Sequence, residues 1–243
     1  MKGLIIKDLM CMKKQIALFS YVTVSVIVLS IMFLLSARYG NIHTGMQITI
    51  EQNQVDECDV VNMYTKSMML FMILPAACIC DPTAILREDN KAGFADFAAA
   101  LPVPVNKRIL AKYISSFCLF VINGIFIVIL SFVLSKLTDM ITFGDFINME
   151  LFLTGILVIL AALTIMLNIV MGKGKEIFAS IIASFVITAS LAIPLVRAAI
   201  NDYQSILRFP REQGYLVILV AVGIVVVSYF VSVFTAQKKR GVV

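Results

Sequence analysis

The sequence predicts an all-α, polytopic membrane protein with six transmembrane helices, and three observations support this prediction. Of its 243 residues, 60% are hydrophobic and only 14% are charged, with a mean hydropathy of +0.98. A soluble domain carries about 25% charged and about 45–50% apolar residues, so the excess here is too large for a soluble core to bury. Apolar segments of membrane-spanning length recur along the chain, and lysine and arginine concentrate in alternate connectors between them.

The amino-terminal segment 1–14 is short and basic, with an imperfect amphipathic pattern. Apolar side chains recur on one face at helical spacing, and Lys2, Lys7 and Lys14 supply positive charge around it. A helix of this kind lies in the membrane interface with its lysines directed at anionic headgroups. The alternative is that these lysines are simply the positive residues that precede a transmembrane span on its cytoplasmic side. We predict the interfacial helix.

Six segments are predicted to span the membrane: 16–35, 60–80, 110–134, 151–171, 177–196 and 215–234. Each has roughly the 20 residues that cross a hydrocarbon core of about 30 Å. The second is the least uniform, because Lys66 lies near its outer end and Pro75 lies within it. Proline is tolerated in a transmembrane helix where neighbouring groups satisfy the freed carbonyl, so we expect a kink at Pro75.

The basic residues predict the orientation of the whole chain, 1–243, which forms one membrane domain. If the amino terminus is cytoplasmic, then the basic segment 1–14, the connector 81–109, the turn 172–176 and the Lys238-Lys239-Arg240 tail are all cytoplasmic as well. The connectors on the other side carry few lysines and arginines, and segment 197–214 among them is rich in apolar and aromatic residues. Cytoplasmic connectors are enriched in these two residue types, so we predict that both termini are cytoplasmic.

Several kinds of chemistry lack the residues they need. The GKGKE turn at 172–176 has neither the spacing nor the preceding strand of a phosphate-binding loop. His43 is the one histidine, and the Cys78-x-Cys80 pair has no matching ligands, so we predict no metal, cofactor or catalytic site in this chain. The spans contain essentially no charged residues, whereas ion-coupled transporters hold such groups near the midplane. The amides Asn123 and Asn168 are expected to form hydrogen bonds between helices.

The connector 81–109 joins the second and third spans. Phe94, Phe97 and Leu101 recur at helical spacing and form an apolar stripe, while charged residues supply the rest of the surface. Pro102 and the second proline that follows it end the helix. A short amphipathic helix between two spans suits a docking site for a partner protein, and it equally suits a helix that lies on lipid. Periodicity alone does not separate these two interpretations.

The order of residues in and after this connector resembles the cytoplasmic signature of type-2 ATP-binding-cassette (ABC) exporter permeases. The residues that carry the resemblance are Glu88, Gly93, Phe97, Leu101-Pro102, Arg108 and Ala111-Lys112-Tyr113. The start of the chain, MKGLIIKDL, is also similar to the start of small bacterial members of that family, and the six-span layout extends over the full length. The chain differs at 89–92, where it has Asp-Asn-Lys-Ala and many members carry a Ser/Gly-rich turn.

The resemblance implies a division of labour between subunits. Two permease chains would pair, as a homodimer or with a related permease, and each would bind a separate ABC ATPase subunit that holds ATP and Mg²⁺. The connector 81–109 would be the coupling helix, 1–14 an elbow on the bacterial cytoplasmic membrane, and 197–214 a pair of short re-entrant helices. The residues expected to couple to the ATPase are Glu88, Gly93, Phe94, Phe97, Leu101 and Pro102.

The same resemblance implies the type of cargo. Small permeases of this kind are similar to exporters of amphipathic peptides, including phenol-soluble modulins, and of other hydrophobic compounds. The sequence therefore predicts the substrate pathway of an ATP-driven exporter that is itself no enzyme and binds no nucleic acid. The alternatives are a secondary transporter or small-solute channel, which the uncharged spans disfavour, and a membrane enzyme, sensor or immunity protein without transport.

Overall fold

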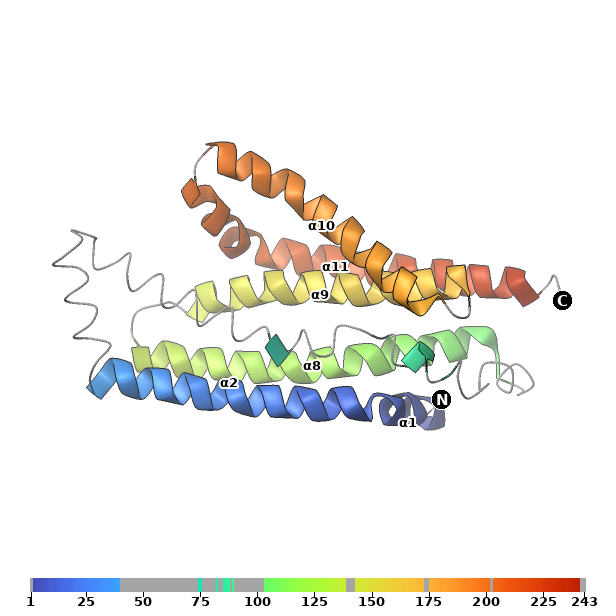
Figure 1. The fold of residues 1–243 in the computed structure, drawn as a ribbon, viewed down its shortest axis with the longest axis horizontal. Coiled ribbons are helices and arrows are strands. Elements are labelled where there is room, and N and C mark those ends of the chain that lie inside the picture. The colour runs from blue at the N-terminus through green and yellow to red at the C-terminus, as the bar shows by residue number, and fades with distance from the viewer. Residues whose placement is uncertain are drawn as a thin grey trace.

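The structure is a computed structural model that describes residues 2–39, 74, 75, 82, 85–87, 89, 103–138, 143–172, 175–201 and 203–240. Within these residues the regular structure is helical and contains no strand. The helices are α1 (Lys2–Cys11), α2 (Lys13–Tyr39), α8 (Val105–Thr138), α9 (Phe143–Met171), α10 (Glu176–Asn201) and α11 (Tyr203–Arg240), arranged as in Figure 1. The prediction of an all-α protein is thus confirmed for the described part of the chain.

Four of these helices contain a segment long and apolar enough to cross a membrane. The segments are Lys13–Met32, Val105–Val133, Glu150–Met171 and Gln213–Lys238. They coincide with the first, third, fourth and sixth predicted spans, and many of their large apolar side chains are exposed, as expected for helices that face lipid. The prediction of a polytopic membrane protein is confirmed.

The other two predicted spans are covered only in part. The predicted span 177–196 falls in α10, where Glu176–Ser190 forms a shorter apolar helix. The predicted span 60–80, with the expected kink, lies outside the described residues except for Leu74 and the buried, helical Pro75. Around the predicted re-entrant segment 197–214 the backbone is helical on both sides of residue 202, and its re-entrant position in the membrane stays a prediction.

Two predicted boundaries can be compared directly with the structure. The amino-terminal helix α1 ends at Cys11, Met12 forms a turn, and α2 begins at Lys13, so Lys14 belongs to the spanning helix rather than to the segment before it. The chain changes direction there (Figure 1). Of the tight turn predicted at 172–176, the structure describes residues 172, 175 and 176: α9 ends at Met171, Gly172 has a φ of 89°, and its N–H donates to the Asn168 carbonyl over 2.9 Å. Glycine adopts this left-handed conformation without a steric penalty.

Helix α9 lies between α8 and α11 (Figure 1). It runs antiparallel to α8 and parallel to α11, with α10 as the return segment. Two glycines allow α9 and α11 to approach closely. A Cβ added at Gly155 would lie 2.9 Å from Val217 Cγ1, and one added at Gly214 would lie 2.0 Å from the carbonyl oxygen of Asn148. Small residues permit such close packing of helices in membranes, where dispersion rather than burial from water favours association.

Two apolar clusters hold the bundle together at the end that contains α1. One consists of Met12, Phe19, Ile85, Leu119, Phe120 and Ala161, and joins α2, α8, α9 and the segment around residue 85. The other consists of Ile109, Tyr113, Ala162, Ile165 and Val233, and joins α8, α9 and α11. Helix α8 and helix α9 contribute to both clusters, so the two clusters are joined through these two helices.

Candidate functional site

Residues 85–87 and 89, near the start of the predicted coupling connector, lie against the helix bundle, and the backbone that contains them is called the turn at 85–89. The backbone is helical at 85–87 and 89, and the Ile85 amide donates to the Pro82 carbonyl over 3.1 Å. Ile85 is only 1% exposed and packs in the first apolar cluster, whereas Arg87 is exposed. Asp89 is buried as well, at 5% exposure. The turn therefore places an apolar and an acidic side chain against the bundle.

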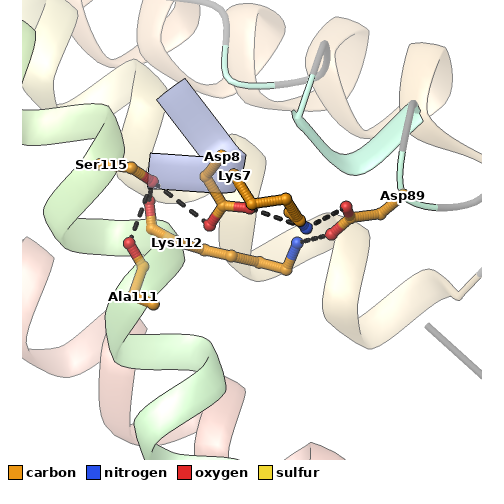
Figure 2. Close-up of polar contacts among 6 residues, drawn as sticks. All are labelled: Lys7, Asp8, Asp89, Ala111, Lys112 and Ser115. Atoms are coloured by element: carbon orange, nitrogen blue, oxygen red, sulfur yellow. Dashed lines mark hydrogen bonds and ion pairs between the residues drawn. The ribbon is translucent and has the colours of Figure 1, made fainter. Parts of the chain in front are cut away.

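The Asp89 carboxylate lies between lysines from two different helices (Figure 2). Nζ of Lys7 in α1 donates to its Oδ1, and Nζ of Lys112 in α8 donates to its Oδ2. Lys7 Nζ also lies 2.9 Å from Oδ1 of its neighbour Asp8. A single carboxylate thereby connects α1, α8 and the turn at 85–89. We call Lys7, Asp8, Asp89 and Lys112 the ion cluster.

The ion cluster is largely withdrawn from solvent and its charges balance. The side chains of Asp8 and Asp89 are 4% and 7% exposed, and those of Lys7 and Lys112 are 27% and 21% exposed. A buried carboxylate is costly unless it is paired and hydrogen-bonded, so each of these two anions requires its lysines. Because pairs of this kind are directional, they fix the position of Asp89 more closely than the apolar contact of Ile85 alone.

The environment of Lys7 keeps its ammonium charged. Burial, the largest single effect, would lower the pKa of Lys7, but the hydrogen bonds to Asp89 and Asp8 and the negative charges of both carboxylates together raise this pKa above its ordinary value of 10.5. On the α8 side, the Ser115 hydroxyl lies 3.5 Å from Oδ2 of Asp8 and 2.9 Å from the Ala111 carbonyl (Figure 2). Since a hydroxyl donates only one proton, the shorter bond to Ala111 is the main one.

Helix α8 extends the connection from the ion cluster to α11. Next to Lys112, the Tyr113 hydroxyl is hydrogen-bonded to the Ser232 hydroxyl over 3.1 Å, and both side chains are buried. The Tyr113 ring also meets Tyr229 edge to face, with centroids 5.9 Å apart and planes at 88°. The Gln237 amide donates to Oδ1 of Asn106 over 3.0 Å. The amino-terminal half of α8 is therefore fixed to α1 on one side and to the end of α11 on the other.

The residues predicted to couple to an ATPase, Glu88, Gly93, Phe94, Phe97, Leu101 and Pro102, lie outside the described residues. Of the lysines predicted to face headgroups, Lys2 is in α1, Lys7 is in the ion cluster, and Lys14 is exposed at the start of α2. The interfacial placement of α1 stays a prediction. What the structure adds is that Lys7 pairs with two acidic groups.

Three members of the ion cluster were not predicted as site residues. Asp8 and Asp89 read as ordinary polar surface in the sequence, and Lys112 as an interfacial lysine that follows the positive-inside pattern. The available signal was that all four charges fall on the predicted cytoplasmic side: Lys7 and Asp8 precede the first span, Asp89 follows the second, and Lys112 lies at the start of the third. Which acid pairs with which base across a separation of 82 residues depends on the tertiary fold. Among the described residues, no group of three or more His, Cys, Asp or Glu side chains is placed to bind a metal ion.

The fold and the site together define a class of protein: a multi-helix membrane protein in which Ile85 and Asp89, from the segment that follows the second predicted span, contact several helices at once. The family profile described as ABC-2 family transporter protein matches residues 3–239, so the chain belongs to the ABC-2 transporter family and is a membrane permease of an ABC transporter. No curated protein and no solved structure matches the chain significantly.

Proposed function

We propose that this permease is the membrane subunit of an ATP-driven exporter, and that the connector 81–109 transmits the movement of a separate ATPase subunit to the membrane helices. The observation that carries the proposal is the double anchoring of the turn at 85–89. Ile85 fixes it to the apolar cluster of α2, α8 and α9, and Asp89 fixes it to α1 and α8. A connector held in this way cannot move without moving the helices that hold it.

The transmission follows the contacts from one element to the next. A displacement of the connector acts on Asp89, whose lysines lie in α1 and α8. Helix α8 is fixed to α11 by the Tyr113–Ser232 hydrogen bond and to α9 by shared apolar clusters. Packed helices respond by shifting as units, because their interfaces favour a few discrete arrangements over continuous deformation. The connector and helices α1, α8, α9 and α11 thus move together.

The energy source lies in the partner. ATP and Mg²⁺ are bound by the ATPase subunit, and the permease supplies the pathway and no catalytic residue. A second permease copy, identical or related, completes the pathway, and α1 rests in the interface of a bacterial cytoplasmic membrane with both termini in the cytoplasm. Family membership supports an ABC ATPase partner, and the exposed apolar faces of α2, α10 and α11 offer surface for lipid and for a second copy.

The proposed cargo is an amphipathic peptide or another hydrophobic compound. The resemblance of the connector and the amino terminus to small peptide-exporting permeases supports this class. Cargo of this kind partitions into apolar surroundings, which the four described apolar segments supply.

The coupling role is tested with Phe97→Asp and Leu101→Asp in the predicted apolar stripe. Each change places a charge where the stripe would enter a groove of the ATPase, and an unpaired buried charge is strongly unfavourable. We expect the variants to insert normally, to retain little ATPase on purification, and to lose ATP-driven export of a labelled amphipathic peptide from inverted membrane vesicles.

The matched control is Phe209→Asp, the same substitution in the segment predicted to lie on the opposite side of the membrane. It should leave the amount of co-purified ATPase unchanged. Normal ATPase binding and normal export by Phe97→Asp and Leu101→Asp would show that the connector does not couple the two subunits.

A further inference from the structure

Glu150 is a buried acidic side chain that the proposed transmission does not use. It lies in the second turn of α9 and is 2% exposed. The amino-terminal end of α9 is at the end of the bundle remote from α1 (Figure 1). Within the described part of the chain, neither its Oε1 nor its Oε2 has a hydrogen-bond partner. The predicted spans 110–134 and 151–171 leave this residue in the connector between them, but the structure places it within α9, at the start of the apolar segment Glu150–Met171.

The other two buried acidic side chains of the described residues show what Glu150 lacks. Asp8 and Asp89 are similarly buried, and each is paired with lysine. A carboxylate that is withdrawn from water needs a cation or several hydrogen-bond donors to offset its lost solvation. Glu150 has two acceptor atoms with this need unmet, and the chemistry that meets it is a cation that carries N–H donors.

The residue faces the interior shared by α8 and α9. Ala161 of α9 and Phe120 of α8 lie in the same apolar cluster, so these two faces are turned toward one interior. Glu150 precedes Ala161 by eleven residues, and Ser131 follows Phe120 by eleven residues. At about 100° per residue, eleven residues make three turns plus about 20°. Glu150 therefore lies nearly in line with Ala161 along α9, and Ser131 lies nearly in line with Phe120 along α8. Because α8 and α9 are antiparallel, Glu150 and Ser131 reach the same level.

The face of α8 that contains Ser131 is polar along its length. Ser116, Asn123 and Ser131 recur on it at helical spacing and are 1%, 0% and 0% exposed. Among the described residues, the hydroxyls of Ser116 and Ser131 and both amide atoms of Asn123 have no hydrogen-bond partner. Buried polar atoms are nearly always paired, so a row of unpaired ones beside an unpaired carboxyl indicates an interior that receives a polar group.

We propose that Glu150, assisted by Ser131, is a binding site for a primary ammonium group of the transported compound. The Glu150 carboxylate would accept two N–H hydrogen bonds and balance the charge, and the Ser131 hydroxyl would accept the third. This inference rests on the proposed function, which it refines: the cargo is an amphipathic molecule with an amine, such as a lysine-bearing peptide. The apolar part of that cargo would lie against the surrounding aliphatic side chains, and Asn123 lies two turns further along the same face of α8.

The test uses the purified permease in lipid nanodiscs, with dodecylammonium as the probe and dodecanol as its uncharged counterpart. Dicyclohexylcarbodiimide modifies carboxyl groups in apolar surroundings, and mass spectrometry of peptides reports the fraction of Glu150 modified. We expect saturating dodecylammonium to slow the modification by roughly tenfold or more, as a charge-assisted hydrogen bond implies, and dodecanol to leave it unchanged. Ser131→Ala should weaken this protection. Ser135→Ala, one turn away in α8, should not, because its hydroxyl is already bonded to the Phe132 carbonyl.

A second measurement decides the matter if Glu150 resists the reagent. The melting temperature of the permease should rise more with dodecylammonium than with dodecanol, and the isosteric Glu150→Gln variant should lose that difference. Equal protection by both amphiphiles, or an ammonium-specific stabilisation that survives Glu150→Gln, would overturn the proposal. The proposal would also be overturned if Lys66→Gln made Glu150 react faster with dicyclohexylcarbodiimide while dodecylammonium had no effect. Lys66 of the same chain, and not the cargo, would then be the partner of Glu150. None of these measurements requires an ATPase. They therefore test the ammonium site separately from the exporter function, which is tested by ATPase binding and export.

Discussion

Replacing Asp89 with asparagine tests the ion cluster, because the change keeps the shape of the side chain and removes its charge. Lys112 would then lose the carboxylate with which it pairs, and Lys7 would keep only Asp8. Removal of one partner from a buried ion pair costs about 3–5 kcal/mol. The side chains of Lys7 and Lys112 are 27% and 21% exposed, so water can partly solvate their charges in the variant. We therefore expect a loss of unfolding free energy at the lower end of this range, about 3 kcal/mol.

The assay is reversible unfolding of the purified permease in mixed micelles of dodecyl maltoside and dodecyl sulfate. A double-mutant cycle with Lys112→Met isolates the pair, and its coupling energy should be about 1–3 kcal/mol. Arg87→Gln removes a charge two residues away on the exposed side of the same turn and should change stability by less than about 0.5 kcal/mol. A coupling energy indistinguishable from zero, with Asp89→Asn no worse than Arg87→Gln, would refute the reasoning that Asp89 fixes the connector to α8.

Three further predictions concern helix packing, pH and topology. Gly214→Ala should destabilise the permease by about 1–3 kcal/mol in the same assay, because its Cβ would meet the Asn148 carbonyl, whereas Gly223→Ala, with open space around it, should be neutral or stabilising. The difference in unfolding free energy between the unchanged permease and Lys7→Met should stay constant between about pH 7 and pH 9, because Lys7 remains charged throughout this interval. A raised pKa keeps that contribution whole below 10.5 and removes it only at higher pH, so loss within this interval would contradict the pairing. A reporter fused after Val243 should report the cytoplasm, and an external signal would invert the predicted topology.

Hydropathy and helix signals in the sequence predicted the parts of the fold that depend on local composition. Four described apolar segments fall where spans were expected, because a run of about 20 apolar residues has few other stable environments. The turn at Gly172 was likewise predictable, since a glycine between two apolar segments supplies the left-handed cap that ends a helix.

The parts that depend on long-range contacts were not predictable in this way. Nothing in the local sequence indicates that Asp89 pairs with Lys7, and Asp89 falls where the chain departs from the more common family pattern. Glu150 was assigned to a loop because a single acidic residue at the edge of an apolar run lowers its hydropathy, although its neighbours bury it. The close approach at Gly214 also depends on which helix lies opposite, which periodicity does not reveal.

The most direct test of the exporter account is to solubilise the permease from its native membrane in mild detergent, isolate it by an affinity tag, and identify stoichiometric partners by quantitative mass spectrometry. The account predicts an ABC ATPase subunit in a one-to-one ratio with the permease, and ATP hydrolysis that disappears when this subunit is removed. A permease that purifies intact as a dimer, with no ATPase and with transport that follows an ion gradient, would contradict the account and leave the connector without its proposed role.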